Sequence, residues 1–301
     1  GFTIANLARS IEDDRNFLYL QLLKAISVKQ PPFFQLENVK GLENIDEGAV
    51  LPMIIQDLEN AGTEKSKFFP SNGKGYRVYY NVLNAYDFGV PQNRERVIIL
   101  GIRNDIPIGT LANHISDKPI DSKKPSKRLL INATPHIKST EEEPQPLKNK
   151  INLMYELWKN KENVIHHFSS QDKCYRVTNL RDAIGDLPLN YSENCPFHNH
   201  TGSACKVNIK NRMGNRPTDW EKRAPTIMGR GSGTGGPLIP PHPEQHRRLS
   251  IREVARIQTF PDDFVFEGTN SACYRQIGNA VPVLLSYNIA KIFSEYESSL
   301  Q

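Results

Sequence analysis

Two short groups of polar residues have side chains that could bind a ligand and move a proton. Glu37 and Asn38 close an apolar run, and Arg94 and Arg96 stand two residues apart directly before another apolar run. A carboxyl group can share a proton with a ring nitrogen if it can carry that proton near neutral pH, a state that burial favours. A guanidinium group stays charged and offers a rigid fork of donors to an oxygen atom or a phosphate. These residues are therefore candidates for binding a polar ligand and moving a proton.

Both groups also have a plainer interpretation. A carboxylate at a strand end is commonly solvated, and two arginines on either side of Glu95 commonly belong to a surface ion pair. The choice between these interpretations depends on the motifs that accompany the two groups.

The elements that must position these residues follow from hydrophobic periodicity. The pattern predicts helices over residues 14–28 and 51–58 and strands over residues 33–39, 76–84 and 96–102. Pro31 and Pro32 end the first helix. This order is typical of an α/β protein, and specifically of the second half of a doubly wound sheet. Glu37 would then lie at the end of a parallel strand, where such sheets bind their ligands.

A dense block near the carboxy terminus, residues 247–266, predicts a helix. Ser250 is suited to open that helix and places Val254 and Ile257 on one face. The helix would be amphipathic, because its charged residues lie largely off that face: Arg252, Glu253 and Arg256.

A second block follows at residues 275–283. Its Gly278-Asn279 pair predicts a tight turn before an apolar helix that runs from Val281 to Phe293. Asn279 would also suit the first cap of that helix.

Four blocks, in this order, resemble the motifs of the DNA (cytosine-5) methyltransferases: Glu37-Asn38-Val39, Pro91-Gln92-Asn93-Arg94-Glu95-Arg96, and the blocks at 247–266 and 275–283. The resemblance covers most of residues 1–103 and 220–295. It implies that a thiolate attacks C6 of a cytosine flipped out of duplex DNA. C5 then accepts a methyl group from S-adenosylmethionine.

The resemblance also implies roles for individual residues. Glu37 would bind N3 and the exocyclic amine of the cytosine and share a proton with N3. Arg96 would contact O2, and Arg94 would face the catalytic loop or a phosphate. The other candidates serve the cofactor, namely Asn279, Ala280 and Val281, or the substrate and DNA, namely Asn38, Gln92, Arg230 and Arg248. Gln92 would act by fixing its loop, and Arg248 has a structural role in the recognition domain as its alternative.

The nucleophile of the family stands in a Pro-Cys-Gln loop, and none of the four cysteines of this sequence has that context. Residues 1–5 instead resemble those that follow the nucleophile. We therefore expect the carboxy-terminal portion of a methyltransferase. A missing amino-terminal segment, or a separate polypeptide, would carry the cofactor-binding glycine motif and the cysteine.

The expected organisation has four segments. They are a catalytic half-domain at 1–103, an insertion and connecting segment at 104–188, a small loop-rich target-recognition domain at 189–245, and a return to the catalytic domain at 246–301. The charge runs at 123–128 and 141–144 predict a mobile surface segment within the insertion. Residues 179–188 resemble the family helix that leads into the recognition domain.

Composition adds few constraints. The net charge of +5 permits nucleic-acid binding without requiring it. The four cysteines form no disulfide framework in 301 residues, and no apolar run approaches the length of a membrane span. We expect a cytoplasmic protein, associated with the nucleoid if it is bacterial, with no membrane partner.

Two further patterns do not support sites. Gly231 to Gly236 fits a dinucleotide-binding glycine motif, but Pro237 follows, so no helix opens there to bind a phosphate. Cys195, His198, His200 and Cys205 are possible zinc ligands by type, but their spacing matches no strong pattern, so we expect no metal.

Three functions remain open. The first is a part or subunit of a DNA cytosine-5 methyltransferase, of the kind found in restriction–modification systems. The second is a non-catalytic DNA-binding or regulatory subunit, and the third is a tRNA cytosine-5 methyltransferase. The loop-rich segment 189–245 favours duplex DNA, and the complete set Glu37, Arg94, Arg96 and Asn279 favours an enzyme.

Overall fold

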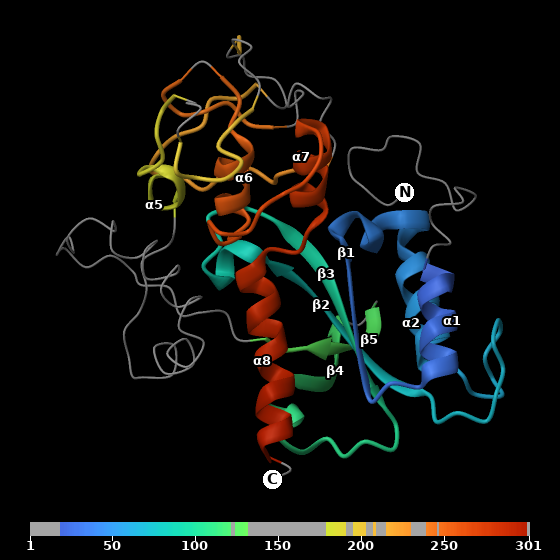
Figure 1. The fold of residues 1–301 in the computed structure, drawn as a ribbon. Coiled ribbons are helices and arrows are strands. Elements are labelled where there is room, and N and C mark those ends of the chain that lie inside the picture. Colours follow the sequence, from blue (N-terminus) through green and yellow to red (C-terminus); the bar gives the residue numbers. More distant parts are fainter. Residues whose placement is uncertain are drawn as a thin grey trace. The chain divides into compact units, whose positions relative to one another are not determined.

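The computed structural model describes residues 19–121, 124–131, 179–190, 195–202, 207–208, 215–229, 239–245 and 247–299. The chain divides into two compact units (Figure 1). Unit 1 contains Gly1–Leu83, Glu95–Asn132 and Asn288–Gln301, and unit 2 contains Asn84–Arg94 and Ala133–Tyr287. Residues 84–94 and 247–287 belong to unit 2.

Unit 1 is built on a five-stranded sheet with the order β1-β3-β2-β5-β4. Its elements are α1 (Tyr19–Lys29), β1 (Phe33–Val39), the 3-10 segment η2 (Lys40–Gly48), α2 (Val50–Glu59), β2 (Tyr76–Asn84), β3 (Glu95–Arg103), η4 (Gly109–Asn113), β4 (Ile115–Asp121), β5 (Lys124–Leu129) and the end of α8 (Val283–Ser299). The predicted helix at 51–58 and the three predicted strands are confirmed. The described part of the first helix also agrees, while residues 14–18 lie outside the described residues.

The sheet is mixed rather than parallel. β1 pairs with β3 in an antiparallel ladder, β2 pairs with β5 in parallel, and β4 pairs with β5 antiparallel. The expectation of a parallel strand at Glu37 is therefore wrong. In the antiparallel register Glu37 faces Ile98 and Val39 faces Arg96, so Glu37 and Arg96 are diagonal neighbours across the two strands.

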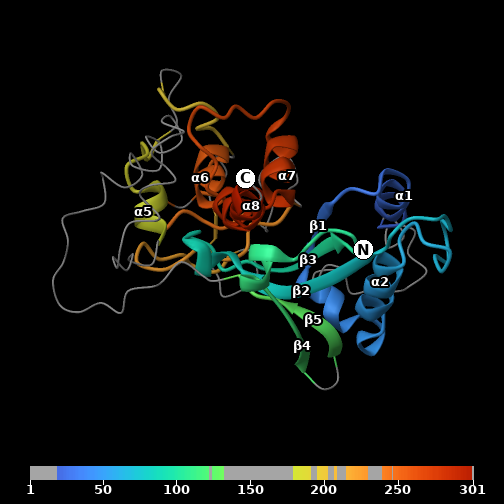
Figure 2. The same ribbon diagram turned by 90° about the horizontal axis from the view of Figure 1, so that it is seen from below.

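The charge run at 123–128 was expected in a mobile surface segment, and this is wrong for its described part. Residues 124–129 form β5, which lies beside β2 and β4 in Figures 1 and 2. Leu129 at its end is fully buried, and the Lys127 ammonium lies 5.6 Å from the ring centre of Tyr79. Backbone pairing and these contacts outweigh the polarity of the run. Residues 141–144 lie outside the described residues.

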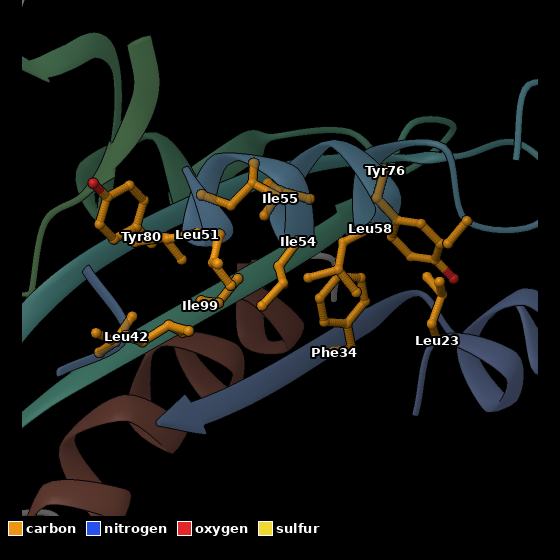
Figure 3. Packing of buried hydrophobic residues seen from close by; sticks show 14 of the residues in the cluster. Leu23, Phe34, Leu42, Leu51, Ile54, Ile55, Leu58, Tyr76, Tyr80 and Ile99 are labelled. Atoms are coloured by element: carbon orange, nitrogen blue, oxygen red, sulfur yellow. The ribbon is translucent and has the colours of Figure 1, made fainter. Parts of the chain in front are cut away.

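The strands that carry the catalytic candidates of unit 1, β1 and β3, pack into one apolar core. α2 turns its apolar residues toward β3 and β1, as Figure 3 shows for Leu51, Ile54 and Leu58 near Ile99 and Phe34. The residues of β3 from 97 to 100 are all buried, which is typical of a strand covered on both faces. Arg96 lies at the start of β3 and is therefore held in place by the packed remainder of the same strand.

The described residues of unit 2 contain few regular elements. They are α5 (Leu180–Ile184), α6 (Ile251–Ile257), α7 (Asn270–Asn279), the 3-10 segment η3 (Ala85–Phe88) and the first residues of α8. Asn179 caps α5 and Ser250 caps α6, each through a reciprocal capping box. The predicted helix start at Ser250 is confirmed, and α5 lies within the helix expected at residues 179–188. Among the described helices none is long and apolar enough to cross a bilayer.

The expectation of an amphipathic helix after Ser250 is wrong. All seven residues of α6 are buried, including Arg252 at 0% and Glu253 at 1% exposure. The Arg252 guanidinium donates to the carbonyls of His198, Pro261 and Phe264. α6 packs against α5 and α7, and neighbouring irregular segments present carbonyl and carboxylate oxygens to its charged side chains, so these are satisfied within the protein.

Candidate functional site

The strongest site candidate in unit 1 is an ion pair between Glu37 and Arg96. The Arg96 Nε atom lies 2.6 Å from Glu37 Oε1, and both side chains are largely shielded, at 11% and 21% exposure. Arg96 also donates from Nη1 to the Glu95 carbonyl at 2.8 Å. The diagonal register of the antiparallel strands creates this contact.

Burial lowers the pKa of Arg96, and the Glu37 carboxylate opposes that effect. An arginine remains charged under any ordinary condition, so the shift leaves Arg96 a cation with little water around it. A shielded cation interacts with an oxygen atom more strongly than a solvated one does.

The residues on either side of this pair have local roles. Asn38 Oδ1 accepts from the Val39 amide at 2.8 Å, which folds its side chain onto the backbone at the strand end. Lys40 and Glu95 form a separate, exposed ion pair at 2.7 Å. The plainer interpretation of a surface ion pair thus applies to Glu95, while Arg96 turns to Glu37.

Arg94 belongs to unit 2 and is almost fully buried, at 1% exposure. Its guanidinium donates to the carbonyls of Ile227 at 2.8 Å, Gly278 at 2.9 Å and Ala280 at 2.9 Å. The two arginines of the 91–96 block therefore make separate contacts, although only one residue lies between them. Arg94 holds the end of α7 against the segment that contains Ile227.

Gln92 is also fully buried and is bonded at both ends of its carboxamide. Its Oε1 accepts from the Ile227 amide at 2.9 Å, and its Nε2 donates to Gln258 Oε1 at 3.0 Å. These contacts agree with a residue that fixes its loop.

Gly278 and Asn279 do not form the expected turn. They are the last two residues of α7, and the backbone becomes extended at Ala280. The expectation that Asn279 caps the next helix is also wrong, because α8 begins at Val283. Glycine is needed at 278 because the backbone of Met228 and Gly229 would collide with a Cβ atom there. Gly278, which the sequence predicted as a turn residue, instead allows close packing of α7 against residues 228–229.

Two residues that sequence reasoning missed hold the start of α8. The Gln258 carbonyl accepts from the Val283 amide at 3.2 Å, and the Thr259 hydroxyl accepts from the Leu284 amide at 3.0 Å. Thr259 has a φ of +61°, a left-handed conformation that is rare for a β-branched residue. Such a conformation has no signal in a single sequence.

The candidates for DNA contact are only partly described. Arg248 donates to the Ile239 carbonyl at 2.9 Å and to Asn215 Oδ1 at 2.5 Å. These contacts agree with its alternative, structural role. Arg230 lies outside the described residues, as do Gly231 to Gly236.

His200 uses both ring nitrogens within the protein. Its Nδ1 lies 3.0 Å from Ser250 Oγ, and its Nε2 lies 2.7 Å from the Pro188 carbonyl. Burial lowers the pKa of His200, so the ring is neutral near pH 7. Cys205 lies outside the described residues, and among those described no group of three or more suitable side chains could hold a metal ion.

Comparison with known proteins assigns the chain to a family. The model of the C-5 cytosine-specific DNA methylases matches residues 1–295, so the chain belongs to that family. Among curated relatives, the type II methyltransferase M.BsuRI of Bacillus subtilis is 34% identical over 316 residues, covering 96% of this chain and 55% of the relative. M.FnuDI of Fusobacterium nucleatum is 32% identical and covers 97% of this chain and 72% of the relative.

The chain thus spans little more than half the length of M.BsuRI. A solved structure, the Dnmt2 methyltransferase of S. pombe, is 16% identical with a TM-score of 0.49, covering 98% of this chain and 75% of that one.

Proposed function

We propose that this chain forms the base-binding and DNA-recognising part of a DNA cytosine-5 methyltransferase from a restriction–modification system. It would help to transfer a methyl group from S-adenosylmethionine to C5 of a cytosine flipped out of a specific duplex sequence. Membership of the C-5 cytosine-specific DNA methylase family supports the reaction type. The type II methyltransferases among its relatives support the biological setting.

The observation that carries this proposal is the 2.6 Å contact between Glu37 and Arg96. On a cytosine ring, O2 and N3 are neighbouring acceptors, and the exocyclic amine is a donor next to N3. A guanidinium that donates to O2 and a carboxyl group that meets N3 and the amine must lie side by side. A contact between the two side chains in the free protein meets that requirement.

The two groups would then divide the work on the ring. Attack at C6 places negative charge on the ring, and N3 is where that charge can be neutralised by a proton. Glu37 shares a proton with N3, and its carboxyl group accepts a hydrogen bond from the exocyclic amine. Arg96 donates to O2 and stabilises the charge. Their mutual contact holds both side chains near their working positions before the base arrives.

The residues proposed to hold the cofactor follow the last turn of α7. Asn279 is exposed, and Ala280 and Val281 are half-buried, so they offer one carboxamide and two small apolar contacts. This set fits the polar and methylene groups of a methionine moiety. S-adenosylmethionine supplies the methyl group when it is bound.

We assign the attacking thiolate to a cysteine outside these 301 residues. Cys273 is buried and its thiol lies 3.8 Å from the carbonyls of Phe266 and Gly268. Burial raises the pKa of Cys273, which makes it a poor nucleophile. Cys195 has no Pro-Cys-Gln context, and Cys174 and Cys205 lie outside the described residues.

The same proposal covers the architecture. The sheet of unit 1 would be the second half of a doubly wound methyltransferase sheet. Its strands β1, β2 and β3 lie in the catalytic segment 1–103, and residues 246–301 would return to the catalytic domain. Residues 189–245 would form the target-recognition domain. The partners would be duplex DNA and the polypeptide segment that carries the glycine motif and the thiolate, together in the cytoplasm.

Replacing Glu37 with Gln tests the proposal directly. Gln cannot pass a proton to N3, so methyl transfer by the assembled enzyme should fall about 100-fold or more while DNA affinity stays near normal. Glu95→Gln, which breaks only the exposed pair with Lys40, is the matched control. An unchanged turnover rate in Glu37→Gln would refute the role of this residue and the proposal with it.

The purified chain alone should not methylate DNA, because the proposal places the thiolate elsewhere. Incubation with tritiated S-adenosylmethionine and mixed-sequence DNA measures this. Incorporation above background would identify one of the four cysteines as a nucleophile, and its replacement by Ser would show which one.

A further inference from the structure

Three hydrogen bonds run in series through the buried centre of unit 2. The Ile227 amide donates to Gln92 Oε1 at 2.9 Å, Gln92 Nε2 donates to Gln258 Oε1 at 3.0 Å, and Gln258 Nε2 donates to the Ile277 carbonyl at 2.8 Å. Both glutamines are 0% exposed. Because each carboxamide is used at both ends, neither can turn without breaking bonds at both sides.

The series joins two segments to which the proposed function gives different ligands. Ile277 directly precedes the cofactor segment Gly278–Val281. Ile227 belongs to the proposed recognition segment. Gly229, two residues further on, packs so closely on α7 that a Cβ atom there would collide with the Asn279 side chain. A shift in one segment must therefore be accommodated in the other.

The backbone of Gln258 is fixed independently of its side chain. Its carbonyl accepts from the Val283 amide, and the adjacent Thr259 caps the next amide while held at a φ of +61°. A strained conformation of this kind persists only where its surroundings enforce it. The fixed backbone thus positions the Gln258 side chain. That side chain is bonded directly to Ile277, next to the cofactor segment, and through Gln92 to Ile227 in the recognition segment.

We infer that Gln258 is a positioning residue that couples the cofactor segment Gly278–Val281 to the recognition segment at Ile227. The identity of the two ligands rests on the proposed function. Binding at either segment restricts both, so a bound cofactor should strengthen binding of target DNA, and bound DNA should strengthen binding of the cofactor by the same factor. Gln258 touches neither ligand in this account.

Amide hydrogen exchange in the full 301-residue chain tests the physical link. Gln258→Met keeps the volume of the side chain and removes its hydrogen bonds. Exchange of the Ile227 amide should then rise about tenfold, although its direct acceptor Gln92 is unchanged. Gln276→Met, an exposed glutamine on α7 in the same unit, is the matched control and should leave the Ile227 amide as it was. Unchanged exchange at Ile227 in Gln258→Met would overturn the inference.

A second measurement separates positioning from mere structural support. The affinity of the assembled enzyme for target DNA is measured with and without S-adenosylhomocysteine, in the parent and in Gln258→Met. The enhancement by the cofactor analogue should shrink at least threefold in the variant. A structural role alone would lower the amount of folded protein and leave the ratio intact, and an intact ratio would overturn the inference.

Gln258→Glu supplies the rescue. As a carboxylate it accepts from Gln92 but cannot donate to Ile277, whereas the protonated form regains a donor. Protection of the Ile227 amide and of the residues around Ala280 should approach the parent's as the pH falls, and absence of recovery would count against the link. The proposed function would be refuted by a different result, full activity in Glu37→Gln. Failure of the proposed function and failure of the Gln258 link are therefore distinguishable.

Discussion

At the scale of single residues, the two arginines of the 91–96 block make different contacts and therefore have different roles. The Arg94 guanidinium donates hydrogen bonds to three carbonyl groups inside unit 2, whereas Arg96 pairs with the Glu37 carboxylate in unit 1. An arginine bonded to carbonyl groups, such as Arg94, supports the backbone. An arginine paired with one side chain, such as Arg96, can exchange that partner for a substrate. We therefore propose Arg96 as the base-contacting arginine and Arg94 as a residue that positions the end of α7.

Replacing each arginine with Lys should separate these roles. Lysine keeps the charge but lacks the rigid fork, so Arg94→Lys leaves buried carbonyls without donors and should lower the free energy of unfolding by about 3 kcal/mol. Arg96→Lys should cost less, because a Lys ammonium can still pair with the Glu37 carboxylate, and should instead slow methyl transfer. Urea denaturation checks both, and equal midpoints for the two variants would contradict the assignment.

At the scale of elements, α6 is stabilised by ion pairs in which its own charged side chains are buried. Arg247 binds the Glu253 carboxylate through two contacts of 2.8 Å, and the same carboxylate accepts from the Ser250 amide. Arg256 pairs with Asp186 and Asp262 in the same way. Each buried charge is satisfied, so loss of any one partner leaves an uncompensated charge and destabilises the unit.

His242 should make unit 2 sensitive to acid. Its side chain is 1% exposed, its Nδ1 accepts from the amides of Glu244 and Gln245, and burial lowers its pKa from 6.5 to about 4. Glu253 opposes this shift, while Arg247 and His200 add to it. Between pH 6.5 and 4 the unfolded state therefore binds more protons than the folded state. The stability of unit 2 should fall by about 3 kcal/mol as the pH drops through that window.

His242→Asn provides the comparison, because Oδ1 can replace Nδ1 as the acceptor. The variant should lose less stability between pH 7 and pH 4, and the slope that remains should reflect His200, whose pKa burial also lowers. Urea denaturation at a series of pH values measures this. An identical pH dependence in parent and variant would show that His242 does not titrate in this range.

What could be predicted from the sequence depended on whether the deciding contacts were local. The strand at 96–102 and the cap at Ser250 follow from periodicity and capping, which act within a few residues. Gly278 was misread because its constraint comes from Met228, fifty residues away. The buried ion pairs of α6 were invisible for the same reason, since charge in a single sequence indicates a solvated face by default. The pairing of Glu37 with Arg96 required the strand register, which no single segment contains.

At the scale of the whole molecule, the chain crosses between its two units within the motif that carries both arginines, at Arg94 and Glu95. One unit presents the pair proposed to meet the base, and the other presents the segments proposed to meet the cofactor and the target sequence. A single short block therefore contributes to both units, which explains why its residues cannot be assigned one common role.

The proposed contacts also dictate what must happen to the DNA. N3, O2 and the exocyclic amine form the edge of cytosine that pairs with guanine, so Glu37 and Arg96 can reach these atoms only after the base has left its pair. Both side chains are largely shielded, at 21% and 11% exposure, so the base must also move toward them. The enzyme should therefore bind the target cytosine in a flipped-out state.

Extraction of a paired base costs a few kcal/mol, and a mismatch removes part of that cost in advance. The assembled enzyme should bind a duplex with a mismatched target cytosine about tenfold more tightly than the same duplex with a G·C pair, in the presence of a cofactor analogue. A mismatch placed outside the methylated sequence serves as the control and should give no gain. Competition between the duplexes measures the ratio. Equal affinity for paired and mismatched targets would mean that the base stays in the helix, and Glu37 could not then act on N3.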